Sequence, residues 1–204
     1  PRLFEAFILA KKANIELDFV REGTDLAGYK LVIVPSSLVL RTSSSYAFRS
    51  YVEHGGHLYF SYGGSWIGSP NPLGPFFNET FGVSLQDRIA PMPIEKLVCT
   101  RDWMGLNGLK LTYPKTDGAS CIELEPKSGR GVGKDARGNT SLVVNRELGK
   151  GTATLVTHPL EYYLSLVPDA YLKHETFRIY NAVRKEAGLI EPFSCDSALI
   201  EVGL

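Results

Sequence analysis

Three polar residues have the types and the spacing of a nucleophile, a base and an orienting acid. Ser61 follows an apolar run in the stretch "YFSYG" (59–63), and His158 ends a second apolar run, three residues before Glu161. A serine activated by a histidine, which a carboxylate orients in turn, is the arrangement used for acyl transfer. The sharp turn that mounts such a serine has the pattern G-x-S-x-G. Gly63 fits this pattern, but Tyr59 stands where the first glycine belongs.

Each of the three residues also has a structural interpretation, and this is the one we favour. Ser61 suits a strand end as a small residue, and His158 before a proline can hydrogen-bond to the backbone there. Glu161 lies in the first turn of an expected helix, where a carboxylate favours the helix dipole. We therefore expect no catalytic residue in this chain, and a degenerate triad in which Ser61 and His158 are close but not hydrogen-bonded. Loss of a singly bonded Ser61 hydroxyl would then cost at most about 1 kcal/mol.

A second set of residues near the same strand ends could bind a ligand. Aromatic rings offer large amphipathic surfaces, and a sugar ring can stack on such a face. The expected ligand-binding residues are Tyr62, Gly63, Gly64, Trp66 and Trp103. Trp66 is the strongest of these because it follows the glycine pair by two residues. Packing in the core or in an interface is the alternative for each single ring.

No motif for a cofactor or a metal is complete. His54 and His57 flank a Gly-Gly turn, and their spacing across that turn is poor for a metal. The stretch "SGRGVGKDARGN" fails as a phosphate-binding loop, because Ser128 replaces the first glycine and Asp135 follows Lys134. The three cysteines lie far apart and form neither a CxxC pair nor a disulfide framework. We expect no cofactor and no metal.

The elements that position these residues alternate between strands and helices. Buried apolar runs predict one parallel sheet, and helical periodicity predicts helices on both of its faces. The expected parallel strands are 15–20, 30–35, 57–62 and 152–157. Helices are expected at 3–13, within 42–56, within 71–83 and over a long segment that includes Phe177 and Val183 and is stopped by Gly188. Short apolar runs between turn-rich segments predict an antiparallel excursion at 84–148. The expected fold class is therefore α/β.

Composition excludes several partner classes. Lys+Arg and Asp+Glu both number 22, so the zero net charge gives no reason to expect nucleic acid or an anionic membrane. No run of 18 apolar residues is present that would cross a bilayer. No secretion signal is visible, which favours the cytoplasm. The chain opens within an expected helix and ends within an expected strand, and we expect it to be a piece of a longer polypeptide.

Two resemblances follow from these motifs. The strand that ends at Ser61 and the later strand that ends at His158 resemble the class I glutamine amidotransferase-like fold, with its cysteine elbow and its His-Pro-Glu motif. Here serine replaces the cysteine, and Leu160 separates Pro159 from Glu161. The stretches "DLAGYKLVIVPSSLVL", "FRSYVEHGGHLYFSY" and "GPFFNETFGV" resemble, more narrowly, the amidotransferase-like trimerisation domain of β-galactosidases and related glycoside hydrolases.

The narrower resemblance implies a three-layer, flavodoxin- or amidotransferase-like domain at 1–190, followed by the start of a β segment at 191–204. It also implies a non-catalytic role in homo-oligomer assembly, with the active carboxylates in a preceding barrel domain of the same polypeptide whose sugar site this domain helps to wall. Two alternatives stay open. One is a hydrolase or amidotransferase-like enzyme that uses Ser61, His158 and Glu161, and the other is a module of the same fold that binds a small ligand such as a carbohydrate.

Overall fold

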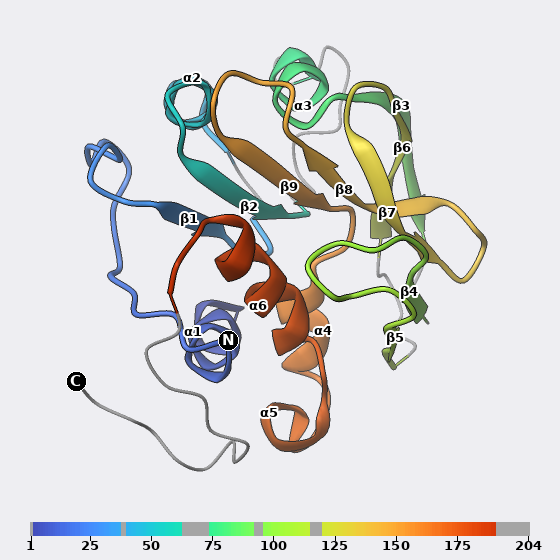
Figure 1. The fold of residues 1–204 in the computed structure, drawn as a ribbon. Coiled ribbons are helices and arrows are strands. Elements are labelled where there is room, and N and C mark those ends of the chain that lie inside the picture. Colours follow the sequence, from blue (N-terminus) through green and yellow to red (C-terminus); the bar gives the residue numbers. More distant parts are fainter. Residues whose placement is uncertain (1, 38–39, 63–73, 92–95, 115–119, 191–204) are drawn as a thin grey trace.

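The computed structural model describes residues 2–37, 40–62, 74–91, 96–114 and 120–190 (Figure 1). In this part of the chain, seven strands form one mixed sheet and two more form a separate antiparallel pair. The order along the large sheet is β1 (Leu31–Val34), β2 (His57–Ser61), β9 (Thr152–Val156), β8 (Thr140–Asn145), β7 (Arg130–Asp135), β4 (Lys96–Cys99) and β5 (Lys110–Thr112). The separate pair consists of β3 (Val83–Pro91) and β6 (Ser120–Pro126).

The parallel part of the sheet brings the candidate site together. β1, β2 and β9 run parallel, with Val34 opposite Phe60 and Ser61 opposite Val156. Their carboxyl ends therefore lie at the same edge of the sheet, where α/β proteins place their ligand sites. The remaining strands of the sheet pair antiparallel. The fold is mixed α/β.

Two of the expectations about strands need correction. Segment 15–20 is extended but belongs to no strand ladder, so the prediction of a strand there is wrong. A strand needs a neighbour for its backbone groups, and no described strand lies on the outer side of β1. Antiparallel pairing within 84–148 is confirmed, but most of it is not an excursion. β8, β7, β4 and β5 continue the same sheet, and only β3 and β6 stand apart.

The helices end where the chain can turn away from the helical path. They are α1 (Arg2–Lys12), α2 (Thr42–Glu53), α3 (Gly74–Phe81), α4 (Leu160–Leu164), α5 (Ala170–Lys173) and α6 (Phe177–Glu186). After α6, Gly188 takes a left-handed conformation (φ +62°) and the Leu189 N–H donates to the Arg184 carbonyl. After α1, Asn14 takes the same role (φ +54°), with the Ile15 N–H donating to the Ala10 carbonyl.

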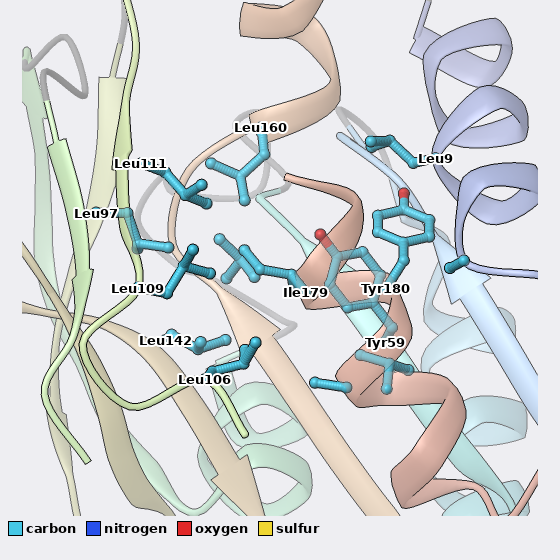
Figure 2. Close-up of a cluster of buried hydrophobic side chains, with 14 of the residues drawn as sticks. Leu9, Tyr59, Leu97, Leu106, Leu109, Leu111, Leu142, Leu160, Ile179 and Tyr180 are labelled. Atoms are coloured by element: carbon cyan, nitrogen blue, oxygen red, sulfur yellow. The ribbon is translucent and has the colours of Figure 1, made fainter. Parts of the chain in front are cut away.

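Two apolar clusters cover the two faces of the large sheet. Figure 1 shows α2 and α3 on one side of the sheet and α1, α4, α5 and α6 on the other. Strand residues alternate between the clusters, because successive side chains point to opposite faces. Tyr59 packs with the α1, α4 and α6 side, whereas Leu58 and Phe60 pack with α2 and α3. Figure 2 shows the first cluster, in which the rings of Tyr59 and Tyr180 lie 5.1 Å apart.

Among the described residues, none of the helices combines the length and the apolar character needed to cross a bilayer.

Candidate functional site

A buried carboxylate, Glu161, is the centre of the candidate site. Its Oε2 accepts hydrogen bonds from the hydroxyls of Ser61 (2.6 Å) and Ser36 (2.7 Å). Its Oε1 accepts from the phenols of Tyr59 (2.9 Å) and Tyr180 (2.8 Å). Glu161 and Ser61 are both 0% exposed. A charge removed from water in this way needs compensation, and the four hydroxyl donors supply it.

The strand ends explain how these groups meet. Ser61 is the last residue of β2, and Ser36 comes two residues after the end of β1, the parallel neighbour of β2. Glu161 lies in the first turn of α4, which begins soon after β9, the other neighbour of β2. Three consecutive strands of the sheet therefore each lead to one member of the cluster.

The proton arrangement of the two serines fits a carboxylate that only accepts. The Ser36 N–H donates to Ser61 Oγ, and the Tyr162 N–H donates to Ser36 Oγ (3.3 Å). Each hydroxyl oxygen thus accepts a backbone N–H and donates its own proton to Glu161. Ser36 reaches this position with a left-handed backbone (φ +42°), which is uncommon for a residue with a side chain.

The two phenols remain proton donors. Burial raises the pKa of Tyr59 and Tyr180 well above the ordinary value, and the negative charge of Glu161 raises both further. Tyr59 occupies the position where the elbow motif requires glycine, and its ring reaches Glu161 from that position. The residue that departs from the motif is thus part of the cluster.

His158 does not join Ser61 and Glu161. Its Nδ1 lies 2.9 Å from Thr157 Oγ1, and its buried Nε2 has no hydrogen-bond partner among the described residues. Burial lowers the pKa of His158 to about 3, so the ring is neutral at physiological pH. The hydroxyl of Ser61 donates to Glu161 instead of the imidazole. The closeness of Ser61 and His158 stays a prediction.

The chemistry open to this arrangement is limited by the missing base and by access. In a nucleophile–base–acid set the histidine lies between the hydroxyl and the carboxylate. Here the hydroxyl of Ser61 donates directly to the carboxylate of Glu161, which is the second residue of α4. Ser61 is also enclosed completely, so a substrate carbonyl has no route to its oxygen in this conformation.

The expected ligand-binding residues fall into two groups. Gly63, Gly64 and Trp66 lie outside the described residues. Tyr62 and Trp103 are each only 4% exposed. Trp103 packs in the cluster on the α1, α4 and α6 side. A ring buried in this way offers no face to a sugar, so these positions argue against the stacking role expected of Tyr62 and Trp103.

Trp103 instead belongs to a second polar cluster, centred on Glu186 at the end of α6. Its Nε1–H donates to Glu186 Oε2 (3.0 Å), and Arg146 donates through Nε (2.5 Å) and Nη2 (2.6 Å). Thr152 Oγ1 donates to Oε1 at 3.3 Å. Desolvation raises the pKa of Glu186, but the bonds from Arg146, Trp103 and Thr152 outweigh it and the pKa is lowered. This cluster ties α6 to β9 and to the end of β8.

The described residues contain no group of three or more His, Cys, Asp or Glu side chains that could hold a metal ion. Of the residues that complete the Glu161 cluster, Ser36, Tyr59 and Tyr180 were not expected as site residues. Ser36 follows the carboxyl end of a predicted strand, and this placement was the signal that could have indicated it.

Comparison with known proteins identifies the family. A model of the β-galactosidase trimerisation domain matches residues 4–170. The β-galactosidase from Bacillus circulans sp. alkalophilus has a similar structure, with 19% identity and a TM-score of 0.67, over 92% of this chain and 27% of that one. The cold-adapted β-galactosidase from Rahnella sp. R3 matches with 20% identity and a TM-score of 0.67, over 93% of this chain and 27% of that one. Comparison with curated proteins finds no significant match.

An enzyme of another specificity shares the fold. The exo-β-1,4-mannosidase from Opitutaceae bacterium strain TAV5 matches with 18% identity and a TM-score of 0.67, over 89% of this chain and 30% of that one. The chain thus spans less than a third of the length of each of these enzymes. With the family model covering 4–170, the chain belongs to the β-galactosidase trimerisation domains, which are accessory domains of glycoside hydrolases.

Proposed function

We propose that this chain is the assembly domain of a longer glycoside hydrolase and performs no catalysis of its own. The observation that carries the second part is the direct bond between Ser61 and Glu161 inside a fully buried cluster. Such a cluster fixes the ends of β1 and β2 to the start of α4, and its role is to stabilise the fold. The glycosidase carboxylates then belong to a barrel domain of the same polypeptide.

The finer description of the fold is part of this proposal. The parallel strands β1, β2 and β9, the helices on both faces and a polar cluster at the carboxyl ends all support a three-layer, amidotransferase-like ancestry. Ser61 takes the place of the nucleophile in that ancestry and Glu161 that of the acid. In this chain the hydroxyls that donate to Glu161 hold it in a structural cluster in place of a catalytic triad.

Assembly requires a surface that copies of the chain or its barrel can bury. A stable interface of ordinary size removes about 800 Å² from each partner. We assign this surface to 84–148, because β4, β5 and β7 extend the sheet away from the parallel strands in this region. Contacts there with the barrel would also place the domain at the wall of the sugar site.

The competing proposal is an acyl-transfer enzyme that uses Ser61, His158 and Glu161. It needs the His158 ring turned to Ser61 and the cluster opened to solvent, and the buried geometry disfavours both. The ligand-binding alternative rests on Gly63, Gly64 and Trp66, since Tyr62 and Trp103 are buried.

The test uses the parent polypeptide and the variant Ser61→Ala. We expect the parent to sediment as a trimer at micromolar concentration, and the variant to keep its glycosidase rate within a few-fold of the wild type. A nucleophile would instead lose orders of magnitude in an acyl-transfer assay. A monomeric parent would refute the assembly role, and an acyl-transfer activity lost with the Ser61 hydroxyl would refute the absence of catalysis.

A further inference from the structure

One face of the sheet carries a row of lysines at β4, β5 and β7. Leu97 of β4 points into the buried cluster on the α1, α4 and α6 side, so Lys96 and Val98 point to the opposite face. Lys110 of β5 and Lys134 of β7 lie opposite Val98, one on each side of it. Neighbouring strands are about 4.8 Å apart, so the backbones of these two lysines are about 10 Å apart, with Val98 between them.

Within the described part of the chain, no apolar layer covers this row. The cluster on the α2 and α3 side covers the same face of β1, β2, β9 and β8, but it contains no residue of β7, β4 or β5. Lys96, Lys110 and Lys134, which form the lysine face, are exposed and make no ion pair with a described residue. Val98 between them is partly buried. The three like charges repel one another, and an acidic partner would relieve this repulsion.

The other end of the molecule carries the opposite charge on segment 15–20, the acidic segment. Figure 1 shows the connection from α1 to β1 at the end of the sheet that β1 forms, whereas β4 and β5 lie at the other end. Ile15 and Leu17 pack against the cluster on the α1, α4 and α6 side. Glu16 and Asp18 alternate with them, and both are exposed. The segment contains no lysine or arginine, and neither acid makes an ion pair with a described residue.

A closed ring of three copies needs two different surfaces on each chain. The chain belongs to the β-galactosidase trimerisation domains. In a three-fold ring every contact is heterologous, which means that one surface of a protomer meets a different surface of the next protomer. The two surfaces must therefore complement each other in charge and shape. The lysine face and the acidic segment are opposite in charge and lie at different ends of one sheet, so they meet this requirement.

We infer that the lysine face of one copy binds the acidic segment of the next copy. The inference rests on the proposed function, because it names the partner of the assembly surface at 84–148. Phe19 of the acidic segment is 69% exposed, and against Val98 of the lysine face it would give the contact an apolar centre with a charged rim. Charge pairs at such a rim fix the orientation of the partners and speed their association, and salt weakens them.

Charge reversal in the parent polypeptide tests this pairing. The variant Lys110→Glu/Lys134→Glu places acids opposite the acidic segment, and like charges across an interface are strongly unfavourable. Its trimer should dissociate at roughly 100-fold higher concentration in sedimentation, and Glu16→Lys/Asp18→Lys should weaken the trimer to a similar degree. A chain with all four substitutions restores the opposite charges, and its dissociation constant should return to within about tenfold of the wild type.

The matched control is Lys150→Glu/Lys185→Glu, which changes the net charge by the same amount at exposed positions outside the lysine face. We expect it to leave the dissociation constant within about threefold of the wild type. All variants should keep the thermal midpoint of the wild type, which separates a lost contact from a lost fold. A control that weakens the trimer as much as Lys110→Glu/Lys134→Glu would overturn the inference, because net charge alone would then account for the effect.

Salt provides a second measurement that needs no substitution. The wild-type trimer should dissociate more readily as NaCl rises from about 0.05 to 0.5 M. A trimer that neither salt nor either reversal weakens would overturn the inference and leave the assembly role intact. Reversals that weaken the trimer but do not rescue each other would also overturn it, because the lysine face would then bind a different surface. A parent that is monomeric at micromolar concentration would refute the proposed function and the inference with it.

Discussion

Replacement of Glu161 by glutamine tests whether the buried cluster stabilises the fold through its charged acceptor. In Glu161→Gln one oxygen becomes an NH₂ group, which faces two hydroxyl donors whichever way the amide turns. Two hydrogen bonds are then lost. A hydrogen bond to a charged group contributes roughly 1.5–3 kcal/mol, so the free energy of unfolding should fall by about 3–6 kcal/mol. Rotation of the hydroxyls favours the lower end of this range.

Urea denaturation followed by circular dichroism measures this loss. The matched control is Glu147→Gln, an exposed position whose side chain makes no hydrogen bond to a described residue, and we expect it to change stability by less than about 0.5 kcal/mol. If Glu161→Gln unfolds within about 1 kcal/mol of the wild type, the cluster is not the stabilising element that we infer. Ser61→Ala should fall between the two, at about 1–3 kcal/mol, because Ser61 makes two buried hydrogen bonds where one was expected.

Three further outcomes are expected. The unfolded chain protonates His158 below its ordinary pKa of 6.5 and the folded chain only near 3, so His158 should lower stability by about 1.4 kcal/mol per pH unit as pH drops through this range. His158→Asn should reduce the slope of stability against pH by this contribution in denaturation measured from about pH 7 to about pH 4, and an unchanged slope would contradict the assignment. Tyr180→Phe removes one of two donors to Glu161 Oε1 and should cost about 1–2 kcal/mol in urea denaturation; a neutral result would show that this phenol does not contribute. A methyl group at Gly151 would overlap the carbonyl oxygens of Gly56 and Val52, so Gly151→Ala should lower the thermal midpoint by several degrees, whereas Gly28→Ala, in open space, should leave it unchanged; equal midpoints would refute the packing argument.

Local patterns predicted the parallel strands well, and they failed where a strand depends on a distant partner. The segments 31–34, 57–61 and 152–156 form the expected parallel strands. They could be predicted because a strand buried on both faces needs mostly apolar residues along its own sequence. The order in which β9 separates β2 from β8 has no such local signal, because it depends on pairing between distant segments. Segment 15–20 carries the alternation of a strand, but alternation alone does not provide backbone partners.

The candidate site was predicted in part for a similar reason. Ser61 and Glu161 were indicated by their places at a strand end and at a helix start, and the structure brings them together. Tyr180 was not indicated, since helical periodicity does not show where a phenol oxygen points. Which group bonds Ser61 depends on the three-dimensional path of the chain, which brings Glu161 in the first turn of α4 to the end of β2.

The place of β9 within the sheet has a consequence for how the protein forms during synthesis. β9 pairs with β2, yet Thr152 follows its partner His57 by about 95 residues. At typical rates of protein synthesis of about 5–20 residues per second, β2 waits for several seconds until the ribosome has made β9. Through this interval the inner edge of β2 stays open, with the apolar side chains of β1 and β2 only partly covered. A nascent chain in this state is exposed to wrong pairing, and the slow step of folding should be the insertion of β9.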